Sequence, residues 1–150
     1  MAPFRSLLIK ILLEQAIAAE EYAYRLYEGL LRSSPPAETA RVLKLLAAAE
    51  LEHRIRLVEF QKDPDTAAGR RTFPSAADRG DEPRPRENRA PADFRHLLVT
   101  ALEKERRAVR RYGKLAEKSR LRTAREVFTY LMRQEMEHEE WILKLLEESE

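Results

Sequence analysis

Two short motifs pair a carboxylate with an imidazole: Glu50-x-x-His53 and Glu135-x-x-His138. Residues three apart are neighbours on an α-helix, so each motif places both groups on one helix face. Carboxylate and imidazole are ligands that suit iron or manganese. The chain has no cysteine, which excludes thiolate metal sites, thiol nucleophiles and disulfide frameworks. A metal bound here would therefore be held by nitrogen and oxygen.

The motifs belong to an internal repeat. Residues 9–60 align with residues 94–145 at a constant offset of 85 and without a gap. The alignment also pairs Glu20 with Glu105, and each of these glutamates precedes its motif by 30 residues. The two motifs and this upstream pair thus comprise four matched carboxylates and two matched imidazoles.

Four helices are expected to carry these residues. Apolar residues recur every three or four positions over about 4–32, 36–60, 92–118 and 122–147. Ser34 precedes Pro35, which indicates a serine cap at the start of the second helix. Short loops make each pair of helices antiparallel.

The two helix pairs, 4–60 and 92–147, are separated by residues 61–91, which hold five of the eight prolines. We expect this segment to be a long crossover that leaves the second and third helices parallel within one domain, 1–150. A linker of this length would also allow the third and fourth helices to pack on another subunit. The expected fold is all-α, a four-helix bundle made of two repeated helix pairs.

The apolar stripes direct the polar residues inward. In the first helix the expected buried stripe is Leu13, Ile17, Glu20, Tyr24, Tyr27 and Leu31. The stripes of the other helices run through Glu50 and His53, through Glu105, and through Glu135 and His138. Four buried carboxylates would repel one another at a cost of several kcal/mol each, whereas two divalent cations would cancel their charge. A Glu from each of two helices and Glu-x-x-His from each of the others is the ligand set of di-iron and di-manganese bundles.

A single Glu-x-x-His motif usually lies in solvent, so a structural bundle with an empty site remains an alternative. The third histidine, His96, has no counterpart in the other repeat, where Ile11 stands, and is expected at the surface or its boundary. The helix over 92–118 also carries basic residues expected to face outward, opposite Glu105, as a solvated face or a docking surface for an acidic protein: Arg107, Arg110, Arg111, Lys114 and Lys118.

The complete pattern, with Tyr27 and Tyr112 added, resembles the di-iron domain of rubrerythrins in the ferritin-like superfamily. The resemblance implies a non-haem centre of two iron ions, with manganese possible, that reduces hydrogen peroxide or dioxygen. It also implies roles for the ligands. Glu50 and Glu135 would bridge the metals, Glu20 and Glu105 would be terminal carboxylates, and His53 and His138 would bind one metal each.

Two departures from the family matter. Rubrerythrins commonly carry a rubredoxin-like domain with four cysteines, which is missing here, so an external rubredoxin-like donor is expected to supply electrons. Rubrerythrins also carry an extra glutamate where this chain has Ala108, paired with Ala23 in the repeat. The remaining ligand set is shared with ferroxidase centres, so an iron-handling bundle that oxidises Fe²⁺ is the alternative function.

Tyr27 and Tyr112 lie two turns beyond Glu20 and Glu105 on the same helix faces. A phenol there would hydrogen-bond a metal carboxylate or supply an electron during peroxide cleavage. The other interpretation is a core tyrosine that needs only a partner for its hydroxyl.

Composition limits the partners. The 28 basic residues nearly balance the 26 acidic ones, which argues against a nucleic-acid binder. No apolar run approaches the roughly 20 residues of a membrane span, and no secretory signal is apparent, so a cytoplasmic protein is expected. A homodimer, with or without swapped helix pairs, is the expected assembly.

Overall fold

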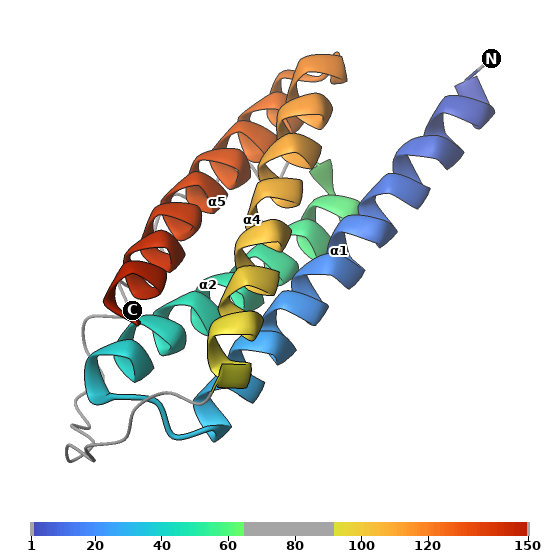
Figure 1. Ribbon diagram of the computed structural model, residues 1–150. Helices are drawn as coiled ribbons and strands as arrows, with labels where there is room; N and C mark the ends of the chain where they lie inside the picture. Colours follow the sequence, from blue (N-terminus) through green and yellow to red (C-terminus); the bar gives the residue numbers. More distant parts are fainter. Residues whose placement is uncertain (1, 65–91, 150) are drawn as a thin grey trace.

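Four helices make up the described part of the computed structural model, residues 2–64 and 92–149 (Figure 1). They are α1 (Ala2–Arg32), α2 (Ala37–Lys62), α4 (Ala92–Lys118) and α5 (Arg122–Glu148). No strand occurs in these two ranges. The prediction of an all-α four-helix bundle is confirmed, and every helix end lies within two residues of its expected position.

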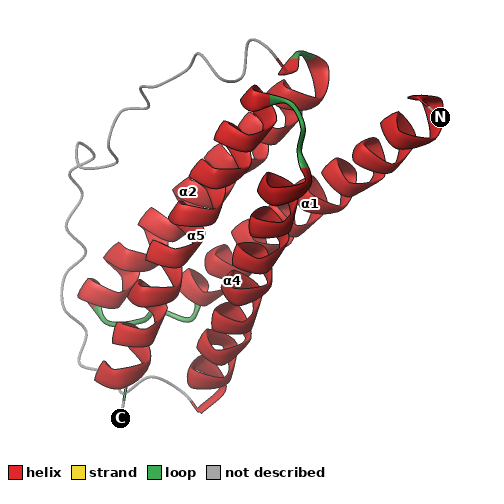
Figure 2. Cartoon of the chain, turned by 90° about the horizontal axis from the view of Figure 1, so that it is seen from above, coloured by secondary structure: helices red, strands yellow, loops and turns green. Residues whose placement is uncertain are grey.

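The helices pack as two close pairs, α1 with α2 and α4 with α5, and the pairs meet where α1 contacts α4 and α2 contacts α5. Figure 1 shows α2 and α4 running in the same direction, as the expected crossover requires. Most of that crossover, residues 65–91, lies outside the described residues. The four helices therefore enclose one interior to which every helix contributes a face (Figure 2).

The turn between α1 and α2 differs from the prediction of a serine cap. Pro36 is the residue that precedes α2, and it makes no side-chain capping bond. The Ser33 hydroxyl instead donates to the Leu30 carbonyl at 2.6 Å, and Ser34 adopts a left-handed φ of 55°. Two prolines stand between the serines and α2, so the Ser33 hydroxyl caps the C-terminal end of α1.

Two apolar clusters fill the interior, one toward each end of the bundle. The first contains Tyr27, Leu30, Leu43, Leu46, Phe94, Leu98, Ile142 and Leu145, among others. The second contains Leu13, Ala16, Leu57, Phe60, Tyr112, Val127, Phe128 and Leu131. Burial of these side chains at about 25 cal/mol per Å² is the main force that holds the pairs together.

The buried face of α1 matches the predicted stripe at Leu13, Glu20 and Tyr27 but differs from it at the other three positions. Ile17, Tyr24 and Leu31 are only half-buried, whereas Ala16 and Ala23 are buried. The prediction favoured large apolar residues, but where helix backbones approach closely only a small side chain fits between them. The interior of α1 is therefore lined in part by alanine.

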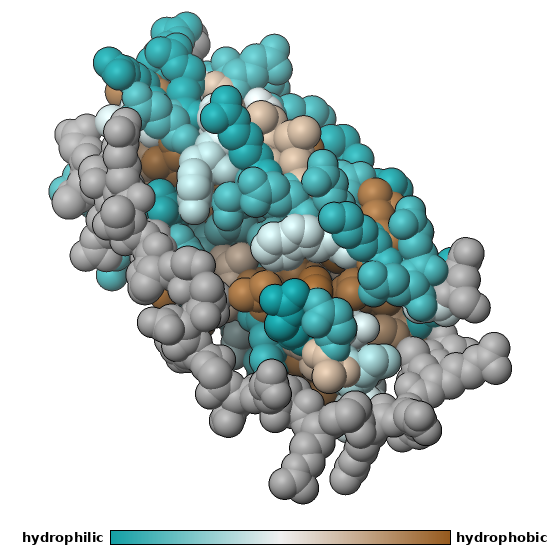
Figure 3. Space-filling model, turned by 90° about the vertical axis from the view of Figure 1, so that its left-hand side faces the viewer, coloured by the Kyte–Doolittle hydropathy of each residue, from teal (hydrophilic) through white to brown (hydrophobic). Residues whose placement is uncertain are grey.

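The N-terminal part of α1 extends beyond its neighbours (Figure 2). It exposes apolar side chains there. Leu7, Leu8, Ile9 and Ile11 are 42–54% exposed. The face drawn in Figure 3 is largely hydrophilic, with hydrophobic residues gathered near its middle. Of the helices described, none has the length and apolarity to cross a bilayer.

Candidate metal centre

Six polar side chains lie in the interior between the two apolar clusters. All are at most 2% exposed: Glu20, Glu50, His53, Glu105, Glu135 and His138. Each helix contributes at least one of them, because each lies on the stripe that faces the bundle axis. The structure therefore brings together every residue that the repeat singled out.

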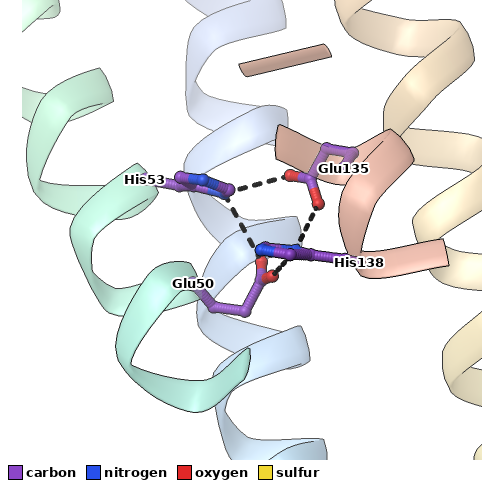
Figure 4. Close-up of side chains that lie close together, drawn as sticks. All are labelled: Glu50, His53, Glu135 and His138. Atoms are coloured by element: carbon purple, nitrogen blue, oxygen red, sulfur yellow. Dashed lines mark hydrogen bonds and ion pairs between the residues drawn. The ribbon is translucent and has the colours of Figure 1, made fainter. Parts of the chain in front are cut away.

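Glu135 lies between the two imidazoles (Figure 4). Its Oε1 is 3.1 Å from Nδ1 of His53, and its Oε2 is 3.1 Å from Nδ1 of His138. Glu50 spans the same gap, with Oε1 2.9 Å from His138 Nδ1 and Oε2 3.9 Å from His53 Nδ1. The two carboxylates thus each face both histidines.

Glu20 and Glu105 flank this group, one on each side. Glu20 Oε2 lies 3.7 Å from Nδ1 of His53, and Glu105 Oε2 lies 3.7 Å from Nδ1 of His138. Each imidazole therefore has its own outer carboxylate. The arrangement has the approximate two-fold symmetry that the sequence repeat predicts.

The two tyrosines reach across this symmetry axis. The Tyr27 hydroxyl, from α1, donates to Glu105 on α4, and the Tyr112 hydroxyl, from α4, donates to Glu20 on α1. Both rings are at most 1% exposed. Each phenol therefore contacts the glutamate of the other repeat, although it shares a helix face with the glutamate of its own.

The imidazole rings of His53 and His138 stack with centroids 5.3 Å apart. Both point Nδ1 toward the carboxylates. His53 Nε2 is buried and has no hydrogen-bond partner among the described residues. Glu50 Oε1 is also buried, and its 2.9 Å contact with His138 Nδ1 lacks the geometry of a hydrogen bond. His138 also lies against Trp141, with ring centroids 5.7 Å apart.

The pKa values show how poorly the metal-free interior tolerates these charges. Burial raises the pKa of Glu50 well above its usual range, and the charge of Glu135 raises it further. Burial also raises the pKa of Glu105, to about 8, against the opposing hydrogen bond from His138. Two of the four carboxylates thus favour the protonated form.

Glu135 and the two histidines stabilise one another's charged forms. Burial opposes ionisation of Glu135, but the charge of His53 and hydrogen bonds from both imidazoles hold its pKa well below the usual range. Burial likewise opposes the charged form of His53 and His138, yet the surrounding glutamates raise both imidazole pKa values well above normal. In the metal-free protein, protons supply the positive charge that the cluster needs.

The donor set fits two divalent cations. One ligand atom from each of Glu50, His53, Glu135 and His138 can be chosen so that all four lie within 4.8 Å of one another. Metal ions at this position would replace the protons that the imidazoles and carboxylates share. Nitrogen and oxygen ligands of this kind suit iron or manganese.

The comparison with protein families agrees with this geometry. Residues 96–150 match the rubrerythrin family model. The rubrerythrin match covers most of α4 and all of α5, and so includes Glu105, Glu135 and His138. It confirms the resemblance for the second helix pair, and the first pair carries the same residue types at the aligned positions. No curated protein and no solved structure matches the chain. The rubrerythrin match and the buried cluster together support a non-haem di-iron protein.

The basic face of α4 is only partly as predicted. Arg107, Arg110, Lys114 and Lys118 are exposed as predicted, and Arg111 is half-buried. Arg107 and Arg111 also line a cavity that Glu105 lines. On the helical wheel these arginines lie on the flank of α4, and their long side chains extend from there to the cavity beside the site. His96 is exposed, as expected.

Sequence reasoning missed two features near the centre. Lys104 lies at the same cavity, although its position next to Glu105 on α4 was a usable signal. Arg56 is only 8% exposed and places its guanidinium 4.2 Å from the centre of the Tyr130 ring. Nothing in the pattern of α2 distinguishes Arg56 from the exposed arginines.

Proposed function

We propose that this chain binds two iron ions and acts as a rubrerythrin-like oxidoreductase that reduces hydrogen peroxide or dioxygen. The observation that carries the proposal is the burial of four glutamates and two histidines in one two-fold arrangement. The rubrerythrin match of residues 96–150 supports the same chemistry. Iron is proposed as the native metal, with manganese as the second choice for this donor set.

The distances support a role for each ligand. Glu50 and Glu135 each face both imidazoles and would bridge the two metals. Glu20 and Glu105 would bind one metal each as terminal carboxylates, beside His53 and His138 respectively. The single hydrogen bond from the opposite tyrosine would orient each terminal glutamate, as hydrogen bonds to metal ligands generally do.

The bound ferrous ions would supply the two electrons, and solvent the two protons, that reduction of one hydrogen peroxide to two waters requires. The protein's own part is to hold and protect the reacting centre. Burial and the adjacent glutamates raise the pKa of Tyr27 and of Tyr112 well above normal, so both phenols stay protonated beside the terminal carboxylates. The apolar clusters above and below exclude bulk water. Electrons for the next turnover are proposed to come from an external rubredoxin-like protein.

A ferroxidase that oxidises Fe²⁺ is the second candidate. It is favoured by the residue at position 108. Ala108 is buried beside the site and stands at the position where rubrerythrins carry an extra glutamate. The two functions share the six ligands and differ in the oxidant and in the fate of the iron.

The first experiment is metal analysis of the purified protein after anaerobic reconstitution with ferrous iron. We expect about two iron ions per chain, and loss of iron binding in Glu50→Ala and in Glu135→Ala, because each removes a ligand shared by both metals. Glu140→Ala is the control, because it removes an exposed glutamate from α5, the helix that carries Glu135. It is expected to bind iron normally. Fluorescence of Trp141, the only tryptophan, is a second readout because its ring contacts His138.

The second experiment mixes the diferrous protein with each oxidant in a stopped-flow instrument. Faster oxidation by peroxide than by dioxygen is expected for a rubrerythrin-like peroxidase. Comparable or reversed rates, with many ferrous ions oxidised per site, would support the ferroxidase. A protein that binds no metal in either experiment would contradict both functions.

A homodimer is proposed as the assembly. The exposed apolar side chains near the start of α1 support an association between copies, since a helix that is apolar on all sides is usually covered. Light scattering of the purified protein measures the oligomeric state.

A further inference from the structure

A cavity of about 90 Å³ adjoins the metal centre between α1 and α4. Its inner wall is made by three of the site carboxylates, Glu20, Glu50 and Glu105. Liquid water takes up about 30 Å³ per molecule, so the space admits a ligand of two or three non-hydrogen atoms. The cavity thus connects the reactive centre with one side of the bundle.

Small side chains keep the cavity open. Ala19 and Ala23 on α1 face Ala108 on α4 across it, and Ala23 and Ala108 are matched positions of the repeat. Ala108 is 9% exposed, so it belongs to the wall of the cavity and not to the outer surface of the protein. A leucine at position 108 would occupy most of the space that a small ligand needs.

Three cations surround the cavity on α4. Lys104, Arg107 and Arg111 complete its lining. They follow one flank of the helix, at spacings of three and four residues. Within the described ranges no carboxylate lies within 4.0 Å of these three side chains in an ion pair, whereas the neighbouring Arg106 is paired with Glu139 at 2.8 Å. Lys104 is held in place by the Tyr22 ring, 4.0 Å from Nζ.

Metal binding would decide the sign of the potential in the cavity. Two divalent ions cancel the charge of four carboxylates, so the loaded centre is close to neutral. The three cations of the lining then remain, and in a narrow space with protein walls they concentrate small anions. A neutral ligand of the same size gains nothing from them.

We infer that this cavity is a binding site for small monoanions of two or three non-hydrogen atoms, which Arg107 and Arg111 attract to the metal centre. The inference rests on the proposed metal centre and specifies which exogenous ligands reach it most readily. Neutral peroxide and dioxygen would use the same route without electrostatic assistance. The Ala23 and Ala108 pair is the part of the wall that sets the size limit.

The test titrates the anaerobic diferrous protein with azide and follows binding by the near-infrared circular dichroism of the ferrous ions. The double variant Arg107→Gln/Arg111→Gln should weaken azide binding by about tenfold at low salt and flatten its salt dependence, because two nearby charges are removed. Binding of nitric oxide, a neutral probe, should change less than twofold. The double variant Arg110→Gln/Lys114→Gln removes two charges from the same helix outside the cavity lining and should leave azide affinity within about twofold.

Ala108→Leu tests the size limit separately. We expect it to retain two iron ions and to lose binding of azide and of nitric oxide alike. Unchanged azide affinity in Arg107→Gln/Arg111→Gln, with iron bound, would overturn the inference and leave the proposed function standing. Absence of iron in the wild-type protein would instead overturn the proposed function, and the inference with it.

Discussion

At the scale of single residues, Glu50 and Glu135 occupy matched positions but have opposite pKa shifts. Burial and the charge of Glu135 raise the pKa of Glu50, whereas the two imidazoles lower that of Glu135 in spite of its burial. An ionised Glu50 therefore destabilises the metal-free fold. Ionised Glu135 stabilises it, since each imidazole lies within hydrogen-bond distance, 3.1 Å, of one of its oxygens. The metal ligands thus contribute unequally before any metal is bound.

Glutamine at these two positions should separate metal binding from stability. At pH 8 without metal, Glu50→Gln is expected to raise the free energy of unfolding by roughly 1–2 kcal/mol, because on folding Glu50 must take up a proton or bury its charge, and glutamine does neither. Glu135→Gln is expected to lower it by roughly 2–4 kcal/mol, because two buried imidazoles lose their shared partner. Urea denaturation in the presence of a chelator measures both. Both variants should bind less iron than the wild type. Destabilisation by both to the same extent would contradict this account.

At the scale of helices, glycine positions show how closely the elements approach. A methyl group added at Gly29 in α1 would meet nothing within 4 Å. One added at Gly113 in α4 would lie 3.3 Å from the sulfur of Met132 on α5, which is tighter than ordinary contact. A side chain of α5 therefore lies directly against Gly113, whereas the space beside Gly29 is open.

Alanine substitution should distinguish these two sites. Gly29→Ala is expected to raise the free energy of unfolding by about 0.5–1 kcal/mol, since alanine is the better helix former and nothing obstructs it. Gly113→Ala gains the same propensity but must displace the Met132 side chain, so its net effect should be smaller or negative. Thermal unfolding of the two variants against wild type provides the comparison. A larger gain for Gly113→Ala would mean that the contact with Met132 costs nothing.

The helices and the polar centre were predictable for different reasons. The period of apolar residues predicted all four helices. The six polar residues of the centre were identified because they match at a constant offset and also lie on the apolar stripes. The predicted stripe of α1 was only partly right: Leu13, Glu20 and Tyr27 are buried. Apolarity ranks Ile17 above Ala16, however, and says nothing about how closely two helices approach. The cavity was not predictable either, because it arises from side chains that are absent at Ala23 and Ala108.

At the scale of the whole molecule, the metal-free protein should lose stability as the pH rises. The pKa of Glu105 is raised to about 8, so its contribution is complete below the unfolded value of about 4.3 and is lost as the pH rises through 8. The raised pKa values of His53 and His138 act in the same direction above about 6.5. Glu135, with its lowered pKa, acts oppositely but only in acid, below about 4.3.

The expected result is a lower melting temperature of the chelator-treated protein at pH 9 than at pH 6.5. Iron or manganese should reverse this dependence, because metal competes with protons for the same atoms and binds more tightly when they are gone. Thermal unfolding at both pH values, with and without metal, checks the prediction. A metal-free protein equally stable at pH 6.5 and 9 would show that the buried cluster does not hold its protons.

The crossed hydrogen bonds have a consequence for the history of the chain. Tyr27 donates a hydrogen bond to the glutamate of the second helix pair, and Tyr112 donates one to the glutamate of the first. Neither pair therefore contains a complete centre. A single pair that met a copy of itself about a two-fold axis would assemble the same six ligands and both tyrosine contacts. The present chain is thus what duplication and fusion of a half-length ancestor would produce, with a covalent connection in place of self-association.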